Sequence, residues 1–222
     1  MLMKTNAAAL AAALLLAGIL HADAALVPYA DFGSWSTAVP GYNSLAIPDP
    51  GPSGFEHFGS GSASVSYGGI LFATNSALSN GDFFNIGSAF SGFPAVLSSQ
   101  QQTQGVPNIL ITLAAPVTAF ALNFDTFYGA DVTFTLSNGE TLTLGSGANA
   151  YDLKGFFGVV DSNPFKTILV TSEDPVLNIN GLNFGAAVAP IPEPATWVML
   201  ILGFLGIGVF GARRHVRHAA AS

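Results

Sequence analysis

Few residues in this sequence have side chains that could carry out covalent chemistry. The 222 residues include no cysteine, which excludes thiolate zinc sites, cysteine nucleophiles and disulfides. A serine hydrolase needs a histidine to activate its nucleophile, and His57 is the only histidine within residues 25–191. It lies in a stretch rich in Gly, Ser and Pro. We therefore interpret His57 as an exposed structural residue and expect no catalytic residues and no enzymatic activity.

Paired carboxylates are the other source of chemistry. Asp125 with Asp131, or Glu173 with Asp174, could act as the acid and base of a glycosidase. That reaction requires a fixed separation between the two carboxyl groups, and spacing in the sequence does not give it. The simpler interpretation is that these acids are solvated surface residues.

Acids in loops could also bind a structural calcium ion. Ca²⁺ takes oxygen ligands, so backbone carbonyls and the side chain of Asn163 or Asn178 could complete such a site. Solvated acidity remains the simpler interpretation. We expect no cofactor and no catalytic metal, and a structural calcium ion stays open.

Aromatic residues in turn-rich segments could bind sugars by stacking. Trp35, Tyr42, Tyr128 and Tyr151 are the candidates, because an amphipathic ring offers an apolar face and a polar edge. The same residues could equally belong to the core. The sequence leaves both alternatives open.

Charged residues are scarce and unevenly distributed. Only 9% of residues are charged and 50% are hydrophobic, which argues against disorder. Residues 25–191 contain two lysines against eleven acidic residues, which leaves a net charge of −9. Binding to phosphates needs a basic face, so a nucleic-acid partner is excluded.

The N-terminal residues have the pattern of a secretory signal. Lys4 precedes an apolar stretch that runs from Ala7 to Leu20. Ala22 and Ala24 then have the small-x-small spacing of a signal-peptidase site. We predict that residues 1–24 are a signal peptide, which signal peptidase cleaves after Ala24.

The C-terminal segment predicts a transmembrane helix. Residues 195–212 contain no charge, and eighteen helical residues span about 27 Å, close to the thickness of a bilayer core. Trp197 lies at one boundary and an arginine cluster at the other, which the positive-inside rule places in the cytoplasm. We predict a precursor anchored in the inner membrane with its acidic body in the periplasm.

A short rigid motif, Pro192-Glu193-Pro194, precedes the predicted helix. Each proline fixes its own φ and keeps the residue before it extended, so that Glu193 points outward. Such a shape could be gripped by a processing enzyme. It could equally be a stiff spacer before a permanent tail anchor.

The order of these C-terminal elements resembles the PEP-CTERM sorting signal of Gram-negative bacteria, in its PEPxxW variant. The resemblance covers residues 192–217 after a linker at 186–191, and departs from the usual pattern at Val198, where a small residue is common. It implies cleavage by an exosortase, a transient stay in the inner membrane and a final place at the cell surface or outside the cell. It also implies bacteria that export polysaccharide, as in biofilms. The residues that carry it are Pro192, Glu193, Pro194, Trp197, Arg213 and Arg214.

The body between these ends is predicted to be all-β. It lacks sustained helical periodicity, and short apolar runs recur between turn signals. Residues 31–64 and 98–105 are rich in turn-forming or polar residues and are predicted to be irregular. The predicted strands are 65–73, 109–113, 117–124, 132–136, 140–144, 156–160, 165–172 and 176–184.

One hairpin can be predicted in detail. A two-residue turn at Asn138-Gly139 would place the apolar residues of its two strands on opposite faces. A three-residue loop, 137–139, instead places Phe134 opposite Leu142 and Thr133 opposite Thr143, provided that Gly139 has a positive φ. We predict this bulged turn.

The second half of the body also resembles the jelly-roll, galactose-binding-like sandwiches of bacterial surface proteins, from "FDTFYGADVTFTLSNGETLTL" to "LNINGLNFG". This resemblance implies an antiparallel β-sandwich over residues 25–185. The leading hypothesis is a non-enzymatic surface or matrix protein associated with exopolysaccharide. The alternatives are a carbohydrate-binding module with a defined ligand site and a permanently anchored envelope protein.

Overall fold

The computed structural model describes residues 26–75, 77–78, 81–88, 93–99, 106–145 and 155–186. They belong to the first of two compact units, Met1–Ala187. The predicted signal peptide, transmembrane helix and sorting motif lie outside the described residues. Within the described ranges, no helix is long and apolar enough to cross a membrane.

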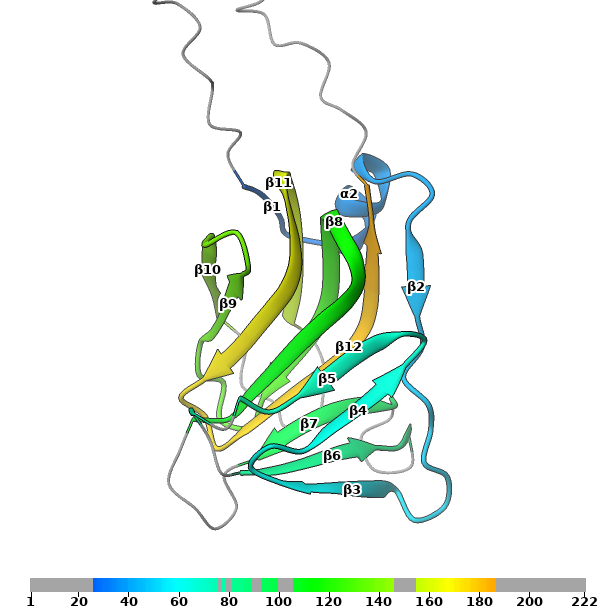
Figure 1. Ribbon diagram of the computed structural model, residues 1–222, viewed down its shortest axis with the longest axis vertical. Coiled ribbons are helices and arrows are strands. Elements are labelled where there is room, and N and C mark those ends of the chain that lie inside the picture. The colour runs from blue at the N-terminus through cyan, green and yellow to red at the C-terminus, as the bar shows by residue number, and fades with distance from the viewer. Residues whose placement is uncertain are drawn as a thin grey trace, which may run out of the picture. The chain divides into compact units, whose positions relative to one another are not determined.

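The described chain is an antiparallel β structure with one short helix (Figure 1). All of its strand pairs are antiparallel. In chain order the elements are β1 (Val27–Tyr29), α2 (Phe32–Ala38), β2 (Asn43–Leu45), β3 (Phe55–Ser60), β4 (Ser64–Tyr67), β5 (Ile70–Ala73), β6 (Asp82–Ile86), β7 (Ala95–Ser99), β8 (Asn108–Thr126), β9 (Val132–Leu136), β10 (Thr141–Leu144), β11 (Gly155–Ser172) and β12 (Val176–Gly185).

Two long strands bend over and take part in both layers of a sandwich. The first half of β11 pairs with the second half of β8, and the second half of β11 pairs with the first half of β8. The register shifts on both sides of Phe165, between the two halves. Figure 1 shows both strands turning at the same end of the sandwich. One layer has the order β10-β9-β11-β8-β5-β4, and the other has the order β1-β11-β8-β12-β7-β6-β3, with β2 beside β12.

The two layers enclose one aromatic and aliphatic core. Phe134 of β9, in one layer, stacks on Phe157 of β11, in the other, with ring centroids 4.0 Å apart and an interplanar angle of 14°. It also meets the edge of Phe124 of β8 at 5.1 Å. All three rings are fully buried. Contact between rings of opposite layers, together with apolar burial, holds the sandwich closed.

The helix α2 covers the outer face of the second layer. Asp31 caps its N-terminus, and the backbone N–H of Ser34, which donates to the carboxylate, holds the pKa of Asp31 below its usual value. Trp35 packs on Ala119 and Ala121 of β8, and its indole N–H donates to the carbonyl oxygen of Val159 at 3.1 Å. The helix therefore buries a large aromatic residue outside the main core.

The predicted β9–β10 hairpin is confirmed. Phe134 pairs with Leu142 and Thr133 pairs with Thr143, whose hydroxyl groups lie 3.0 Å apart on the outer face. The backbone N–H of Leu136 donates to the carbonyl of Glu140, which leaves a three-residue loop at 137–139. Gly139 has a φ of 96°.

Several predicted element boundaries were wrong. Residues 65–73 form a hairpin of β4 and β5 rather than one strand, because Gly68 and Gly69 make a turn. The strands predicted at 109–113 and 117–124 are one bent strand, as are those at 156–160 and 165–172. The segment predicted to be irregular at 31–64 contains α2, β2 and β3, and β6 and β7 were missed. The missed strands are short, and pairing with neighbouring strands outweighs the weak strand preference of each segment.

We expect Phe134→Ala to lower the free energy of unfolding by about 3–5 kcal/mol, because it removes the ring that bridges the layers and leaves a cavity. Urea unfolding of the full chain in detergent measures this. Leu71→Ala is the matched control, since Leu71 is 40% exposed, and should cost about 1 kcal/mol or less. Equal losses for the two variants would contradict a core centred on Phe134.

We expect Gly139→Val to lower the free energy of unfolding by about 1 kcal/mol or more, because a β-branched residue is strained at a positive φ. A Cβ at this position would meet no atom within 4 Å, so the cost comes from the backbone alone. Gly139→Asn is the control, since asparagine tolerates this region better. Equal stability of the valine variant and the native chain in urea would contradict the bulged turn.

Candidate functional site

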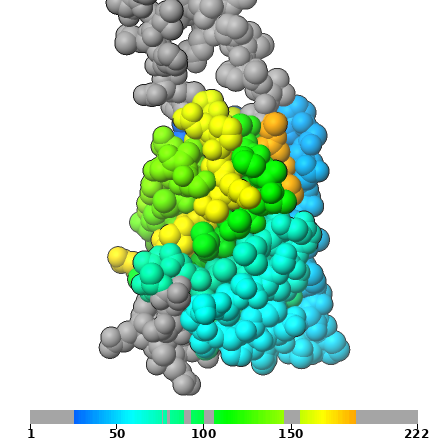
Figure 2. All heavy atoms as spheres, in the orientation of Figure 1, coloured from blue at the N-terminus to red at the C-terminus, as the bar shows by residue number. Residues whose placement is uncertain are grey.

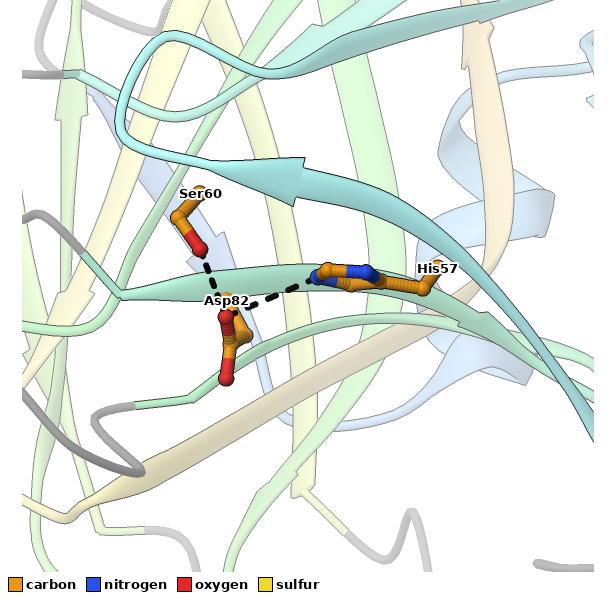
Figure 3. Close-up of polar contacts among 3 residues, drawn as sticks. All are labelled: His57, Ser60 and Asp82. Carbon is orange, nitrogen blue, oxygen red and sulfur yellow. Dashed lines mark hydrogen bonds and ion pairs between the residues drawn. The ribbon is translucent and has the colours of Figure 1, made fainter.

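A polar cluster lies on one face of the edge strand β3 and its neighbour β6 (Figure 3). Residues three positions apart on a regular strand point to opposite faces. The register shifts between His57 and Gly59, however, so that His57 pairs with Phe84 and Ser60 pairs with Asp82. This bulge contains Gly59 at a φ of 122°. It places His57 and Ser60 on the same face, beside the carboxylate of Asp82.

Both side chains of β3 approach the same carboxylate oxygen. The hydroxyl of Ser60 donates to Oδ1 of Asp82 at 2.6 Å, and Nε2 of His57 lies 3.5 Å from that oxygen. His57 is 46% exposed and Asp82 is 26% exposed. In a hydrolytic triad the histidine lies between the serine and the acid. Here the acid lies between the other two, so His57 is not placed to take the proton of Ser60.

Aromatic rings continue this face along the two strands. The imidazole of His57 lies against Phe84 at a centroid distance of 4.7 Å and an angle of 34°. Phe55 meets Phe84 edge-to-face at 6.1 Å and is 53% exposed. We call Phe55, His57, Ser60, Asp82 and Phe84 the β3–β6 face. It combines apolar rings with one carboxylate, one hydroxyl and one imidazole.

A surface of this kind suits a flat ligand with an apolar side and hydroxyl groups. A ring such as that of Phe55 can pack against the C–H groups of a sugar, while the carboxylate of Asp82 can accept hydrogen bonds from its hydroxyls. The face offers no lysine or arginine for an anionic ligand.

An open pocket of about 470 Å³ lies at the bend of β8. Its lining is formed mainly by residues such as Ile70, Leu113, Pro116 and Phe184, and it includes no charged or histidine side chain. It therefore offers no carboxylate, imidazole or ammonium group for acid–base chemistry. The β3–β6 face is the better candidate site.

The C-terminal residues decide the wider assignment. Residues 190–215 match the model of the PEP-CTERM protein-sorting motif. The chain carries a PEP-CTERM sorting motif. The matched range contains every residue on which the resemblance depended, from Pro192 to Arg214. The motif indicates an exported protein that an exosortase processes.

Other comparisons are remote. A mutant of a family 29 carbohydrate-binding module is 15% identical, with a TM-score of 0.28, over 68% of this chain and 98% of that chain. The catalytic domain of a GH87 alpha-1,3-glucanase is 13% identical, with a TM-score of 0.36, over 68% of this chain and 30% of that chain. No curated protein matches the sequence. These likenesses are too distant to indicate a ligand for this chain.

The four aromatic candidates from the sequence differ in exposure. Trp35 is fully buried, and Tyr42 is half-buried against it with ring centroids 5.4 Å apart, so both support α2. Tyr128 is 70% exposed. Tyr151 lies outside the described residues.

The candidate acids are divided between buried and exposed positions. Asp125 is buried and accepts a hydrogen bond from the amide of Asn178 at 2.6 Å. Asp174 is buried as well, and its carboxylate accepts backbone N–H groups. Asp131 and Glu173 are exposed. In each candidate pair, one carboxylate is therefore buried and hydrogen-bonded and the other is exposed.

The asparagines considered as calcium ligands take part in hydrogen bonds within the protein. Asn178 donates to Asp125, and the backbone N–H of Asn163 donates to Asp161 at 2.8 Å. In the part of the chain that the structure describes, no group of three or more His, Asp or Glu side chains is placed to hold a metal ion.

Sequence reasoning missed most of the β3–β6 face. Phe55 and Ser60 lie in a stretch that its glycines and prolines predicted to be irregular. In β6 the run Asp82-Phe83-Phe84 has aromatic residues on both faces, so alternation could not show which ring faces outward. The bulge at Gly59 could not be located from the sequence, because its position depends on how β3 pairs with β6.

Proposed function

We propose that this chain is a non-enzymatic surface or matrix protein that binds neutral polysaccharide outside the cell. In this proposal an exosortase releases it from the inner membrane, and the sandwich is the binding domain. The observation that carries the proposal is the PEP-CTERM motif at residues 190–215. The β3–β6 face supplies the surface for the ligand.

The charge of the body supports an uncharged ligand. Residues 25–191 carry a net charge of −9, so acidic polysaccharides and nucleic acids are repelled at long range. Stacking of sugar rings on Phe55 and hydrogen bonds to Asp82 and Ser60 need no charge on the ligand. This favours a neutral glycan over an acidic one.

A non-enzymatic role is supported by the arrangement of the polar groups. His57 does not contact Ser60 in the cluster of Figure 3, and the buried acids Asp125 and Asp174 are held by hydrogen bonds. Binding needs only the exposed face. A carbohydrate-binding module with a defined ligand site is therefore the form of the proposal that we favour.

The proposed organisation of the precursor rests on its two terminal segments. We propose a signal peptide at 1–24, a jelly-roll, galactose-binding-like sandwich at 25–185, a linker at 186–191 and the sorting signal at 192–217. The predicted membrane helix would hold the precursor in the inner membrane with the sandwich in the periplasm. A permanently anchored envelope protein is the alternative, and processing distinguishes the two.

We expect Glu193→Ala to impair processing and to leave membrane insertion intact, because Glu193 precedes the predicted hydrocarbon span. The uncleaved protein should then accumulate in the inner membrane of a host with an exosortase. Intact mass and fractionation measure both properties. Glu140→Ala, which changes an exposed glutamate of the β9–β10 turn, is the matched control and should be processed normally.

Two results would contradict this prediction. A native protein that still contains Trp197 to Arg217 in that host would favour the permanent anchor. A Glu193→Ala variant that is processed like the native chain would show that the motif does not depend on its glutamate.

We expect Phe55→Ala to weaken binding to neutral polysaccharide several-fold, because an aromatic contact contributes roughly 0.5–1.5 kcal/mol. The full chain, in a detergent without a sugar headgroup, is tested against dextran, mannan, galactan and mixed-linkage glucan, with alginate as an acidic polymer. Val27→Ala is the matched control, since Val27 is exposed to a similar degree on β1. Unchanged binding by Phe55→Ala, or preference for alginate, would contradict the proposed face.

A further inference from the structure

A second exposed aromatic group lies in the turn between β8 and β9. Phe127 is 38% exposed and Tyr128 is 70% exposed. Their rings meet edge-to-face, with centroids 4.8 Å apart and an angle of 83°. The β3–β6 face does not include this pair, and the sandwich core does not use it.

The pair is held in place by a buried carboxylate. Asp174, only 2% exposed, accepts the backbone N–H groups of Phe127 at 3.1 Å, of Tyr128, and of Val176 at 3.2 Å. Ser172 accepts the backbone N–H of Asp174 at 3.2 Å. A carboxylate is costly to bury, and these hydrogen bonds offset that cost. They also fix the backbone of both aromatic residues before any ligand arrives.

The turn lies at the end of the sandwich opposite the bends of β8 and β11. Thr126 at the end of β8 pairs with Leu177 near the start of β12, and Ser172 at the end of β11 pairs with Val132. β12 then runs toward Gly185 at the other end (Figure 1). The aromatic pair therefore lies at the opposite end of the sandwich from the one at which the described chain leaves it.

Two aliphatic side chains extend the apolar surface at this end. The backbone N–H of Ser172 donates to the carbonyl of Pro107, which places Val106 beside the turn that holds Asp174. Val106 in turn donates its N–H to the carbonyl of Leu78 at 2.8 Å. Val106 is 39% exposed and Leu78 is 37% exposed. In the space-filling view the segment that follows β5, in teal, lies next to the end of β11, in yellow (Figure 2).

The polar groups around the pair are acidic. Glu173 and Asp131, both exposed, lie in the two turns that Asp174 joins. Lys166 is the one lysine or arginine within the described ranges, and it lies on the bend side, where its N–H donates to Ser137. Among the described residues, the charges beside the pair are therefore negative, which disfavours anionic polymers and anionic lipid headgroups. Uncharged rings with hydroxyl groups fit it, because carboxylates accept hydrogen bonds from hydroxyls.

We propose that the Phe127–Tyr128 turn is a second sugar-binding site, separate from the β3–β6 face. This inference rests on the proposed function, since it names a further site for the same class of ligand, a neutral glycan. Three strand spacings separate the start of the turn at Thr126 from Asp82, roughly 14 Å. A long glycan engages both sites, whereas a short oligosaccharide engages one at a time. The protein then binds long polymers more tightly than short oligosaccharides.

The test measures binding of four full-length proteins in a detergent without a sugar headgroup: the native chain, Tyr128→Ala, Phe55→Ala and the double variant. The probes are dextran, mannan, galactan and mixed-linkage glucan, each as a long polymer and as the corresponding disaccharides, which are too short to reach both sites. We expect Tyr128→Ala to weaken binding of the preferred polymer about tenfold, which corresponds to about 1.4 kcal/mol. We also expect it to abolish the advantage of polymers over disaccharides. Leu71→Ala, at another exposed apolar residue, should bind like the native chain.

A second readout locates the contact itself. Glycan should slow nitration of Tyr128, the most exposed tyrosine described, and should not slow nitration of half-buried Tyr29. Asp174→Asn, which keeps the shape of the side chain and removes its charge, should weaken polymer binding as well. Because Asp174→Asn can also lower stability, the conclusion about the site rests on the binding measured for Tyr128→Ala.

The outcomes separate this inference from the proposed function. If Tyr128→Ala binds like the native chain while Phe55→Ala is weakened, the second site is overturned and the β3–β6 face stands. If Tyr128→Ala is weakened and Phe55→Ala is not, the turn stands as the sugar site and the β3–β6 face fails. Absence of binding to every neutral polymer overturns both, as does binding of phosphatidylglycerol vesicles in place of glycans.

Discussion

The stack of Phe134 on Phe157 is the contact on which the rest of the sandwich depends. β8 and β11 pass through both layers, so their two halves must be held face to face after the chain has bent back on itself. Phe134 comes from β9 in one layer and meets rings from β8 and β11 in the other. Without a side chain that spans the interior, no ring contact would hold the two halves of each bent strand face to face. Rings suit this position because they bury a large area with few rotatable bonds.

The edge strand β3 and its neighbour β6 can carry function on their outer face because neither strand supplies a ring to this contact. β3 and β6 join the second layer only through β7 and β12. Phe55 and His57 on the outer face of β3 are exposed, while Phe83 on the inner face of β6 is fully buried. One face of this edge is thus required for folding, and the other is available for a ligand. The bulge at Gly59 then determines which polar side chains share that outer face.

Buried acids pin the turns at both ends of the sandwich. Near the bends, the carboxylate of Asp161 accepts the amide of Asn138 at 2.7 Å and the backbone N–H of Asn163, which ties the β9–β10 turn to β11. At the opposite end, Asp174 ties the β8–β9 turn to the start of β12. The acidic character of the body is therefore partly structural. A chain without disulfides can fix its turns in this way.

The sequence by itself determined the sorting motif, the all-β class and the β9–β10 hairpin. These depend on residues close together in the chain: the Pro-Glu-Pro segment with its apolar run and arginines, the apolar alternation, and the loop that ends at Gly139. Only the tertiary structure decided that β8 and β11 each serve two layers, that Trp35 is buried under α2, and which aromatic residues are exposed. Pairing between distant strands sets these features, and short strands such as β3 have too weak a local preference to reveal their partners. The β3–β6 face was hidden in the sequence for that reason, since its residues come together only through the register of two strands and a bulge.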